Sequence, residues 1–290
     1  MPLNANVKDY LKPENLEEAC DFLRENEDAM PVAGGTGISI FMNKGLMSNV
    51  RSLVDLDGLG LSFSKKNNDS LEIGSMTKLA DMIQFTRDLN IARTALLSIP
   101  KEIRNLGTLG GQVFTAYPAF DMSVCLLALG ATVNIYDSSS NKSIALEELY
   151  SGMFQPNIPP GGIIKSVLIP LNKFNNTHYV KIGKTGHGFS DISFGLSADF
   201  RDGTINKIAI AIGGGSLESE PVRLSSVEER LTGMELTKDR IDEAFALVNE
   251  SKSIEFRSDE RTSADFRKHT LAVHIRRVLT DFQSRGGMLK

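Results

Sequence analysis

The sequence predicts an α+β chain of two unequal domains, and two observations support this prediction. Short strand-like apolar segments alternate with segments of helical periodicity through residues 1–172. A polar stretch at 172–177 then separates this part from three strand-like segments followed by two helical ones. We therefore expect a larger N-terminal domain over residues 1–172 and a smaller C-terminal domain over 178–284.

The composition is that of an ordinary globular protein. Hydrophobic residues make up 41% of the chain and charged residues 23%, and the net charge is -4. Lysines and arginines are scattered, so we expect no nucleic-acid partner. The longest apolar runs are far too short to span a bilayer, and no secretory signal opens the chain. A cytoplasmic location is then the default expectation.

The first expected elements place a glycine-rich loop at the start of a helix. Asn15 is a suitable N-cap for a helix over 16–23. Residues 30–33 read as a short buried strand, and 38–44 as a helix ended by Gly45. The glycines between that strand and that helix therefore lie at a helix N-terminus, where N–H groups and the dipole favour an anion.

A hairpin is expected next. Residues 52–56 are strand-like, and two apolar segments, 61–63 and 71–73, flank a polar turn. Thr77 is placed to cap the following helix, which has apolar positions from Leu79 through Leu89.

The remaining elements are predicted in the same way, from apolar periodicity and from glycines that end helices. A helix over 122–129 ends at Gly130, and 132–136 and 163–169 are strand-like. The C-terminal part is expected to contain strands at 179–182, 193–200 and 205–212, then helices at 238–249 and 258–277.

Two glycine-rich stretches carry the functional signal. The first glycine loop, residues 31–37, reads Pro-Val-Ala-Gly-Gly-Thr-Gly, and the second, residues 103–112, reads Ile-Arg-Asn-Leu-Gly-Thr-Leu-Gly-Gly-Gln. Glycines let a backbone turn sharply and approach a ligand closely. Consecutive free N–H groups in such turns suit a phosphate or pyrophosphate. Taken alone, each loop is equally well explained as a plain turn, but together we interpret them as two halves of one cofactor site.

The sequence contains none of the common nucleotide-binding, metal-binding or hydrolytic motifs. No G-x-G-x-x-G occurs, and Gly183-Lys184-Thr185 lacks the upstream glycine of a P-loop. The four histidines have no metal-ligand spacing, and no hydrolytic triad can be assembled, so we assign no catalytic residue and no metal ligand. Cys20 and Cys125 read as buried thiols, and two cysteines cannot hold an iron–sulfur cluster. This pattern suits a protein whose cofactor carries the chemistry.

With their flanks, the two loops resemble a known family, the FAD-binding medium subunit of molybdenum hydroxylases such as xanthine dehydrogenase and carbon monoxide dehydrogenase. The matching segments are Ala33-Gly34-Gly35-Thr36, Ile73-Gly74-Ser75, 103–111 with Pro118 and Asp121, 179–184 with 191–193, 221–223 with Glu228 and 231–233, and 261–267. The resemblance spans essentially the whole chain.

The resemblance implies a fold and a cofactor. The fold is an FAD-binding domain of the vanillyl-alcohol-oxidase (PCMH) type with two α/β subdomains, about 1–57 and 58–172. A smaller C-terminal α+β domain would contain a three-stranded antiparallel sheet and helices. The cofactor implied is FAD, held without a covalent bond.

The resemblance also implies the site. Residues 33–37 and 108–111 would wrap the FAD pyrophosphate with N–H groups and threonine hydroxyls. Asp121 would bond the flavin nucleotide, and Lys181 and Asp191 would approach the isoalloxazine side. The full predicted set is Val32, Ala33, Gly34, Gly35, Thr36, Gly37, Ile38, Leu106, Thr108, Gly110, Gly111, Gln112, Ala116, Asp121, Lys181 and Asp191.

Some positions depart from the family pattern. Gly37 stands where aspartate is frequent, Gln112 where asparagine is usual and Lys184 where arginine is common. The segment before Asp121 is bulkier than the family's small residues, since it contains Phe114, Tyr117 and Phe120.

The function implied is that of a redox subunit. A molybdopterin-containing large subunit would oxidise the substrate, and a small 2Fe-2S subunit would pass electrons to FAD on this chain, which would deliver them to NAD or another acceptor. Two alternatives stay open: a self-contained flavin oxidoreductase of the same fold, and a non-catalytic scaffold that binds FAD weakly or not at all.

Overall fold

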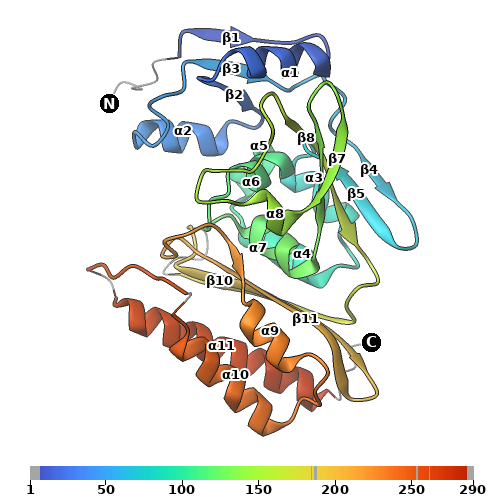
Figure 1. The fold of residues 1–290 in the computed structure, drawn as a ribbon, viewed down its shortest axis with the longest axis vertical. Helices are drawn as coiled ribbons and strands as arrows, with labels where there is room; N and C mark the ends of the chain where they lie inside the picture. The colour runs from blue at the N-terminus through green and yellow to red at the C-terminus, as the bar shows by residue number, and fades with distance from the viewer. Residues whose placement is uncertain (1–6, 184, 186–187, 253, 261, 286–290) are drawn as a thin grey trace.

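The structure is a computed structural model that describes residues 7–183, 185, 188–252, 254–260 and 262–285. Lys184 and Arg261 lie outside the described residues. The described chain forms three β-sheets of three, five and four strands (Figure 1). Among the described residues, no helix combines the length and apolar character needed to cross a bilayer.

The first sheet is small and parallel, with strand order β1-β3-β2. Its elements are β1 (Asp9–Leu11), α1 (Leu16–Glu25), β2 (Ala29–Val32), α2 (Thr36–Asn43) and β3 (Ser52–Asp55). As predicted, Asn15 caps α1, because its side-chain oxygen accepts a 2.9 Å hydrogen bond from the Glu18 N–H. Gly45, in the left-handed conformation, follows α2 and ends it.

The second sheet is antiparallel, with order β4-β5-β8-β6-β7. Its strands are β4 (Ser64–Lys66), β5 (Ser70–Gly74), β6 (Thr132–Tyr136), β7 (Asn141–Ala145) and β8 (Ile163–Pro170). The helices that accompany it are α3 (Leu79–Phe85), α4 (Asn90–Ser98), α5 (Lys101–Leu106), α6 (Leu109–Phe114), α7 (Asp121–Leu129) and α8 (Leu146–Leu149).

Two expectations about this region were wrong in detail. The hairpin is present, but its first strand is β4 rather than 61–63, because Asn67 accepts hydrogen bonds from the N–H groups of Asp69 and Ser70 and closes a tight turn. Thr77 does not cap α3. Its hydroxyl donates to the Phe63 carbonyl at 3.1 Å, and the N-cap position belongs to Lys78.

The C-terminal sheet has order β12-β11-β10-β9 and is antiparallel. Its elements are β9 (Asn176–Ile182), β10 (Ile192–Arg201), β11 (Thr204–Gly213), β12 (Val222–Arg223), α9 (Ser225–Leu231), α10 (Lys238–Glu250) and α11 (Ala264–Ser284). The three expected strands are there, and the two-residue β12 adds a fourth at the edge. The last helix begins at Ala264 rather than 258, because Ser263 caps it by accepting from the Phe266 N–H.

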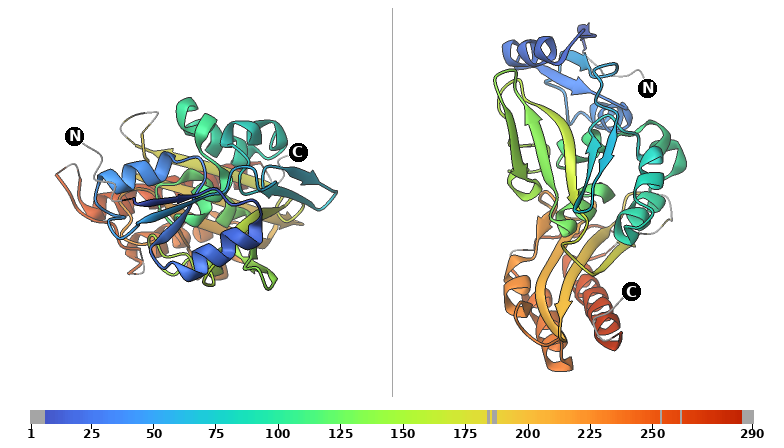
Figure 2. Two further views of the ribbon diagram at one scale, coloured as in Figure 1. Left: turned by 90° about the horizontal axis from the view of Figure 1, so that it is seen from above. Right: turned by 90° about the vertical axis from the view of Figure 1, so that its right-hand side faces the viewer.

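Helix α7 connects the two larger sheets. All nine of its residues are buried, and it packs on β10 and β11 while α4 packs on β9. Glycine permits this close approach: a Cβ on Gly195 would lie 2.7 Å from the Ala128 Cβ. Figures 1 and 2 show the C-terminal sheet with α10 and α11 on its other face.

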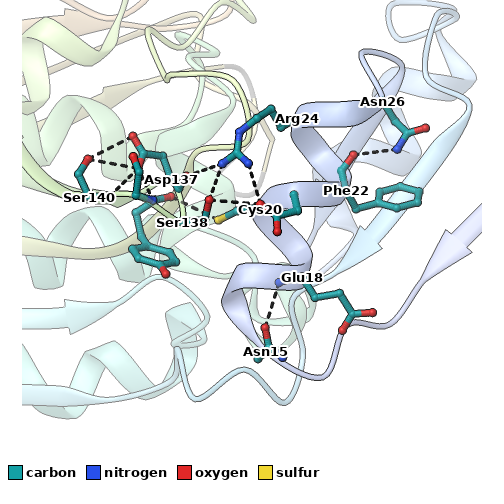
Figure 3. A network of polar contacts seen from close by, with 12 residues as sticks. Asn15, Glu18, Cys20, Phe22, Arg24, Asn26, Asp137, Ser138 and Ser140 are labelled. Atoms are coloured by element: carbon teal, nitrogen blue, oxygen red, sulfur yellow. Dashed lines mark hydrogen bonds and ion pairs between the residues drawn. The ribbon is translucent and has the colours of Figure 1, made fainter.

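A polar network fixes the first sheet against the second (Figure 3). Arg24 on α1 donates to the Asp137 carbonyl and to the Ser138 hydroxyl, both at 2.5 Å, in the turn between β6 and β7. The buried Cys20 lies beside this network, with its sulfur 3.6 Å from the Tyr136 carbonyl oxygen. This network therefore joins α1 to the β6–β7 turn of the five-stranded sheet.

Candidate cofactor-binding site

Both glycine loops line one cleft, which we call the loop cleft. It opens between the β2–α2 connection and the α5–α6 connection, with the start of β8 as its floor. Its lining residues are Met30, Pro31, Val32, Ala33, Gly34, Gly35, Thr36, Gly37, Ile38, Met47, Leu56, Ser75, Met76, Gly107, Thr108, Gly110, Gly111, Gln112, Phe114, Thr115, Phe120, Phe154, Gly162, Ile163 and Ile164.

The two loops touch each other. A Cβ on Gly34 would lie 1.9 Å from the Leu106 carbonyl oxygen, closer than any side chain allows. A Cβ on Gly107 would lie 3.4 Å from the Thr36 hydroxyl oxygen and 2.8 Å from the Ile103 carbonyl oxygen. Glycine at 34 is therefore what lets the two loops meet and form one binding surface, whereas glycine at 107 is needed by the carbonyl of Ile103 in its own loop.

The first glycine loop presents free amide donors. Gly35 is the N-cap of α2, has φ 69°, and makes no side-chain capping bond. In the described part of the chain, no hydrogen bond uses the N–H groups of residues 34–38. Because the first turn of a helix has no internal acceptors for its N–H groups, these donors and the helix dipole are available to an anion.

The second glycine loop has already used most of its donors. The Leu109 N–H donates to the Thr77 carbonyl at 3.0 Å, and the Gly110 N–H to the Ser75 carbonyl at 2.7 Å. The Gly111 N–H donates to the Thr108 hydroxyl oxygen at 3.2 Å, which caps α6. This loop is thus a rigid wall held by the β5–α3 connection, whereas the first loop is a donor surface.

The rest of the cleft is apolar and aromatic, and no lysine, arginine, aspartate or glutamate lines its described surface. Phe120 and Phe154 belong to a cluster of rings that continues outside the cleft. Tyr117 lies at its centre, stacked on Phe154 at 5.4 Å and edge-on to Phe41 at 5.0 Å and Phe189 at 5.7 Å. The bulky segment noted in the sequence therefore contributes an aromatic wall to the cleft through Phe114 and Phe120.

The structure brings eleven of the sixteen predicted site residues together in the loop cleft: Val32, Ala33, Gly34, Gly35, Thr36, Gly37, Ile38, Thr108, Gly110, Gly111 and Gln112. The other five do not line it. Leu106 is 58% exposed, and Ala116 is buried in a turn with φ 49°. Asp191 lies between β9 and β10, where its N–H donates to the Ile182 carbonyl.

Asp121 and Lys181 form a buried pair between the two domains. Asp121 begins α7, and its Oδ2 lies 3.0 Å from the Lys181 Nζ, while its Oδ1 accepts a 2.6 Å hydrogen bond from the Tyr179 hydroxyl. The lysine also donates to the Ser98 carbonyl at 3.1 Å. Burial raises the pKa of the Asp121 carboxyl, and Lys181 and Tyr179 oppose that rise by favouring the ionised form.

Several lining residues were not predicted. Ser75 was visible in the sequence, because it follows a strand-like segment that resembles the family motif. Phe154 and residues 162–164 come from loops far along the chain, and only the position of β8 beside β5 and β6 brings them to the cleft. No local signal marks them.

The cleft fits an extended anionic ligand with aromatic rings. Uncapped N–H groups suit a pyrophosphate, and the apolar walls suit ring systems. Ser75 lines the same cleft, and its buried hydroxyl has no hydrogen-bond partner. These features define a dinucleotide-binding protein, and FAD has this chemistry. In the described residues no group of side chains could hold a metal ion.

Comparison with known families identifies the chain. Residues 5–172 match the family described as FAD binding domain in molybdopterin dehydrogenase, and residues 178–282 match the CO dehydrogenase flavoprotein C-terminal domain. The chain belongs to the family of FAD-binding flavoprotein subunits of molybdopterin dehydrogenases, as the resemblance implied.

Relatives of similar length support this assignment. The chain is 27% identical to the glyceraldehyde dehydrogenase medium chain of Sulfolobus acidocaldarius, over 91% of this chain and 94% of that one. It is also 27% identical to the carbon monoxide dehydrogenase medium chain of Afipia carboxidovorans, over 96% and 97% of the two chains. The solved structure of reconstituted CO dehydrogenase from Oligotropha carboxidovorans is 26% identical, with a TM-score of 0.84 over 93% of this chain and 95% of that one.

Proposed function

We propose that this flavoprotein subunit transfers electrons within a molybdenum-containing hydroxylase or dehydrogenase. It would take electrons from 2Fe-2S clusters on a small subunit and pass them to NAD or another acceptor, while a molybdopterin-containing large subunit oxidises the substrate. The loop cleft is the observation that supports this proposal most strongly, because it joins free amide donors to apolar walls, and its described lining has no acidic or basic side chain.

We assign the cofactor-holding roles as follows. The amides of residues 34–38 would bind the pyrophosphate, and Gly34 would let the second loop lie close without a side chain in the way. The apolar wall with Phe120 and Phe154 would exclude water from the ring end. Bound FAD would supply one- and two-electron redox chemistry. Leu106, Ala116, Asp121, Lys181 and Asp191 stay predicted contacts.

The 2Fe-2S clusters that would supply the electrons have to be bound by another chain. Cys20 on α1 and Cys125 on α7 are the only cysteines, and both are buried. Burial raises the pKa of the Cys20 thiol to about 11, which disfavours the thiolate that ligates iron. The protein would work in the cytoplasm beside its partner subunits.

Co-purification tests the assembly. The tagged protein, isolated from its native source, should carry a flavin spectrum and bring down molybdenum and iron. A yellow protein that comes down alone, without either metal, favours the self-contained oxidoreductase. A colourless protein that takes up no added FAD favours the scaffold.

Gly111→Asp tests the site. A Cβ at Gly111 would lie 3.2 Å from the Thr108 hydroxyl oxygen, a tight contact that requires this one side chain to shift by a few tenths of an ångström. A carboxylate at this edge of the cleft should repel the pyrophosphate and abolish FAD retention. Gly111→Asn is the matched neutral control and should retain substantially more flavin. Normal flavin content in a folded Gly111→Asp variant would show that the cleft is misassigned.

A further inference from the structure

The β5–α3 connection places one buried polar group, the Ser75 hydroxyl, beside the loop cleft, and no role in the predicted cofactor site was assigned to it. Ser75 is 3% exposed, and among the described residues that line the cleft it is the one whose buried side-chain polar atom has no hydrogen-bond partner. Burying a hydroxyl without a partner costs free energy, so such a group in a binding cleft indicates a missing ligand.

The position of this hydroxyl is fixed by its backbone. The Ser75 N–H donates to the Lys165 carbonyl at 2.9 Å, and the Ser75 carbonyl accepts from the Gly110 N–H at 2.7 Å. A Cβ on Gly110 would lie 2.7 Å from the Ser75 Cβ, so the serine packs directly against the second glycine loop. Ser75 therefore lines the cleft from a backbone that is held on both sides.

A pyrophosphate bound in the loop cleft would need hydrogen-bond donors beyond the amides of the first glycine loop. Its described lining contains no cationic side chain, and the amides of Leu109 and Gly110 are already bonded within the chain. A pyrophosphate in this cleft carries negative charge that only hydrogen-bond donors can stabilise here. The second glycine loop offers few such donors, and the Ser75 hydroxyl lies directly beside it.

Resting on the proposed FAD function, we propose that the Ser75 hydroxyl is a cofactor-binding donor, which hydrogen-bonds a phosphate oxygen of FAD from the side of the second glycine loop. The second loop then contributes to phosphate binding through the serine that it packs on, rather than through its own amides. Hydrogen bonds to charged groups are roughly twice as strong as neutral ones, so the effect on affinity is measurable.

Ser75→Ala in the full chain, stripped of flavin, tests this role by titration with FAD, ADP and riboflavin. We expect FAD and ADP to bind roughly ten- to a hundredfold more weakly than to the wild type, and riboflavin affinity to stay unchanged. Ser197→Ala is the matched control, since Ser197 is equally buried and unpartnered but lies on β10 outside the cleft. It should leave all three affinities unchanged.

The melting temperature of the flavin-free variant separates ligand binding from a structural role. Because the hydroxyl has no partner in the chain, Ser75→Ala should melt at or above the wild-type temperature. A clear fall in melting temperature, wild-type affinity for FAD and ADP, or a loss confined to riboflavin would each overturn the assignment. A wild-type protein that binds no FAD would instead overturn the proposed function itself.

Discussion

The two glycine loops look alike in sequence and differ in what they offer a ligand. In the first loop, α2 begins without a capping side chain and its amides have no acceptor in the described chain. In the second, Thr108 caps α6, and the amides of Leu109 and Gly110 are bonded to the β5–α3 connection. A helix that begins without a capping side chain leaves the N–H groups of its first turn unsatisfied. A capping side chain accepts from one of these groups and stabilises the helix.

The difference shows that glycine serves two purposes in one site. In the first loop, Gly35 adopts φ 69° with open space around it, which leaves the backbone accessible. In the second, Gly107 and Gly110 are required because carbonyl oxygens and the Ser75 side chain lie within 3 Å of a would-be Cβ. Gly35 leaves donors exposed, whereas Gly34, Gly107 and Gly110 permit close packing.

The largest expected effect comes from separating the loops. Gly34→Ala would place a Cβ 1.9 Å from the Leu106 carbonyl oxygen, so the loops would have to move apart. We expect the free energy of unfolding to fall by about 3 kcal/mol and FAD retention to be lost. Urea unfolding and flavin stoichiometry measure both.

Gly58→Ala is the control for that variant. Gly58 has a positive φ, 89°, unlike Gly34, and a Cβ there meets nothing within 4 Å. It should cost only about 1–2 kcal/mol from backbone strain and leave flavin stoichiometry intact. If Gly34→Ala binds FAD as well as Gly58→Ala does, the contact between the loops is not needed for binding.

A pair of threonine variants separates the two roles. Thr108→Ala removes the cap of α6 and should lower the stability of the flavin-free protein by about 1 kcal/mol. Thr36→Ala, at the uncapped start of α2, should leave that stability within about 0.5 kcal/mol and weaken FAD binding roughly tenfold. Thermal unfolding without flavin and FAD titration report the two effects, and equal behaviour of the two variants would remove the distinction.

The smallest effect is expected for the polar network that joins α1 to the five-stranded sheet. Arg24→Ala removes the hydrogen bonds from α1 to the turn between β6 and β7 (Figure 3). The side chain is partly exposed, so stability should fall by only about 0.5–1 kcal/mol. FAD affinity should change less than about threefold, because the Gly34–Leu106 contact still sets the spacing of the loops. A larger loss of affinity would make α1 part of the binding site.

The sequence predicted the fold class, most of the elements and the meeting of the loops, since periodicity, N-caps and glycine stops are local signals. It could not show that the amides of Leu109 and Gly110 are bonded to Thr77 and Ser75, because that depends on where β5 lies relative to α6. The same limit hid Phe154, which reaches the cleft only through tertiary packing.

Amide hydrogen exchange, followed by NMR in the flavin-free and FAD-loaded full chain, tests the contrast between the loops most directly. We expect the amides of residues 34–38 to exchange rapidly without FAD and to become protected when it binds. Those of Leu109 and Gly110 should be protected in both states. If Leu109 and Gly110 gain as much protection on FAD binding as residues 34–38 do, the two loops act alike and the account is contradicted.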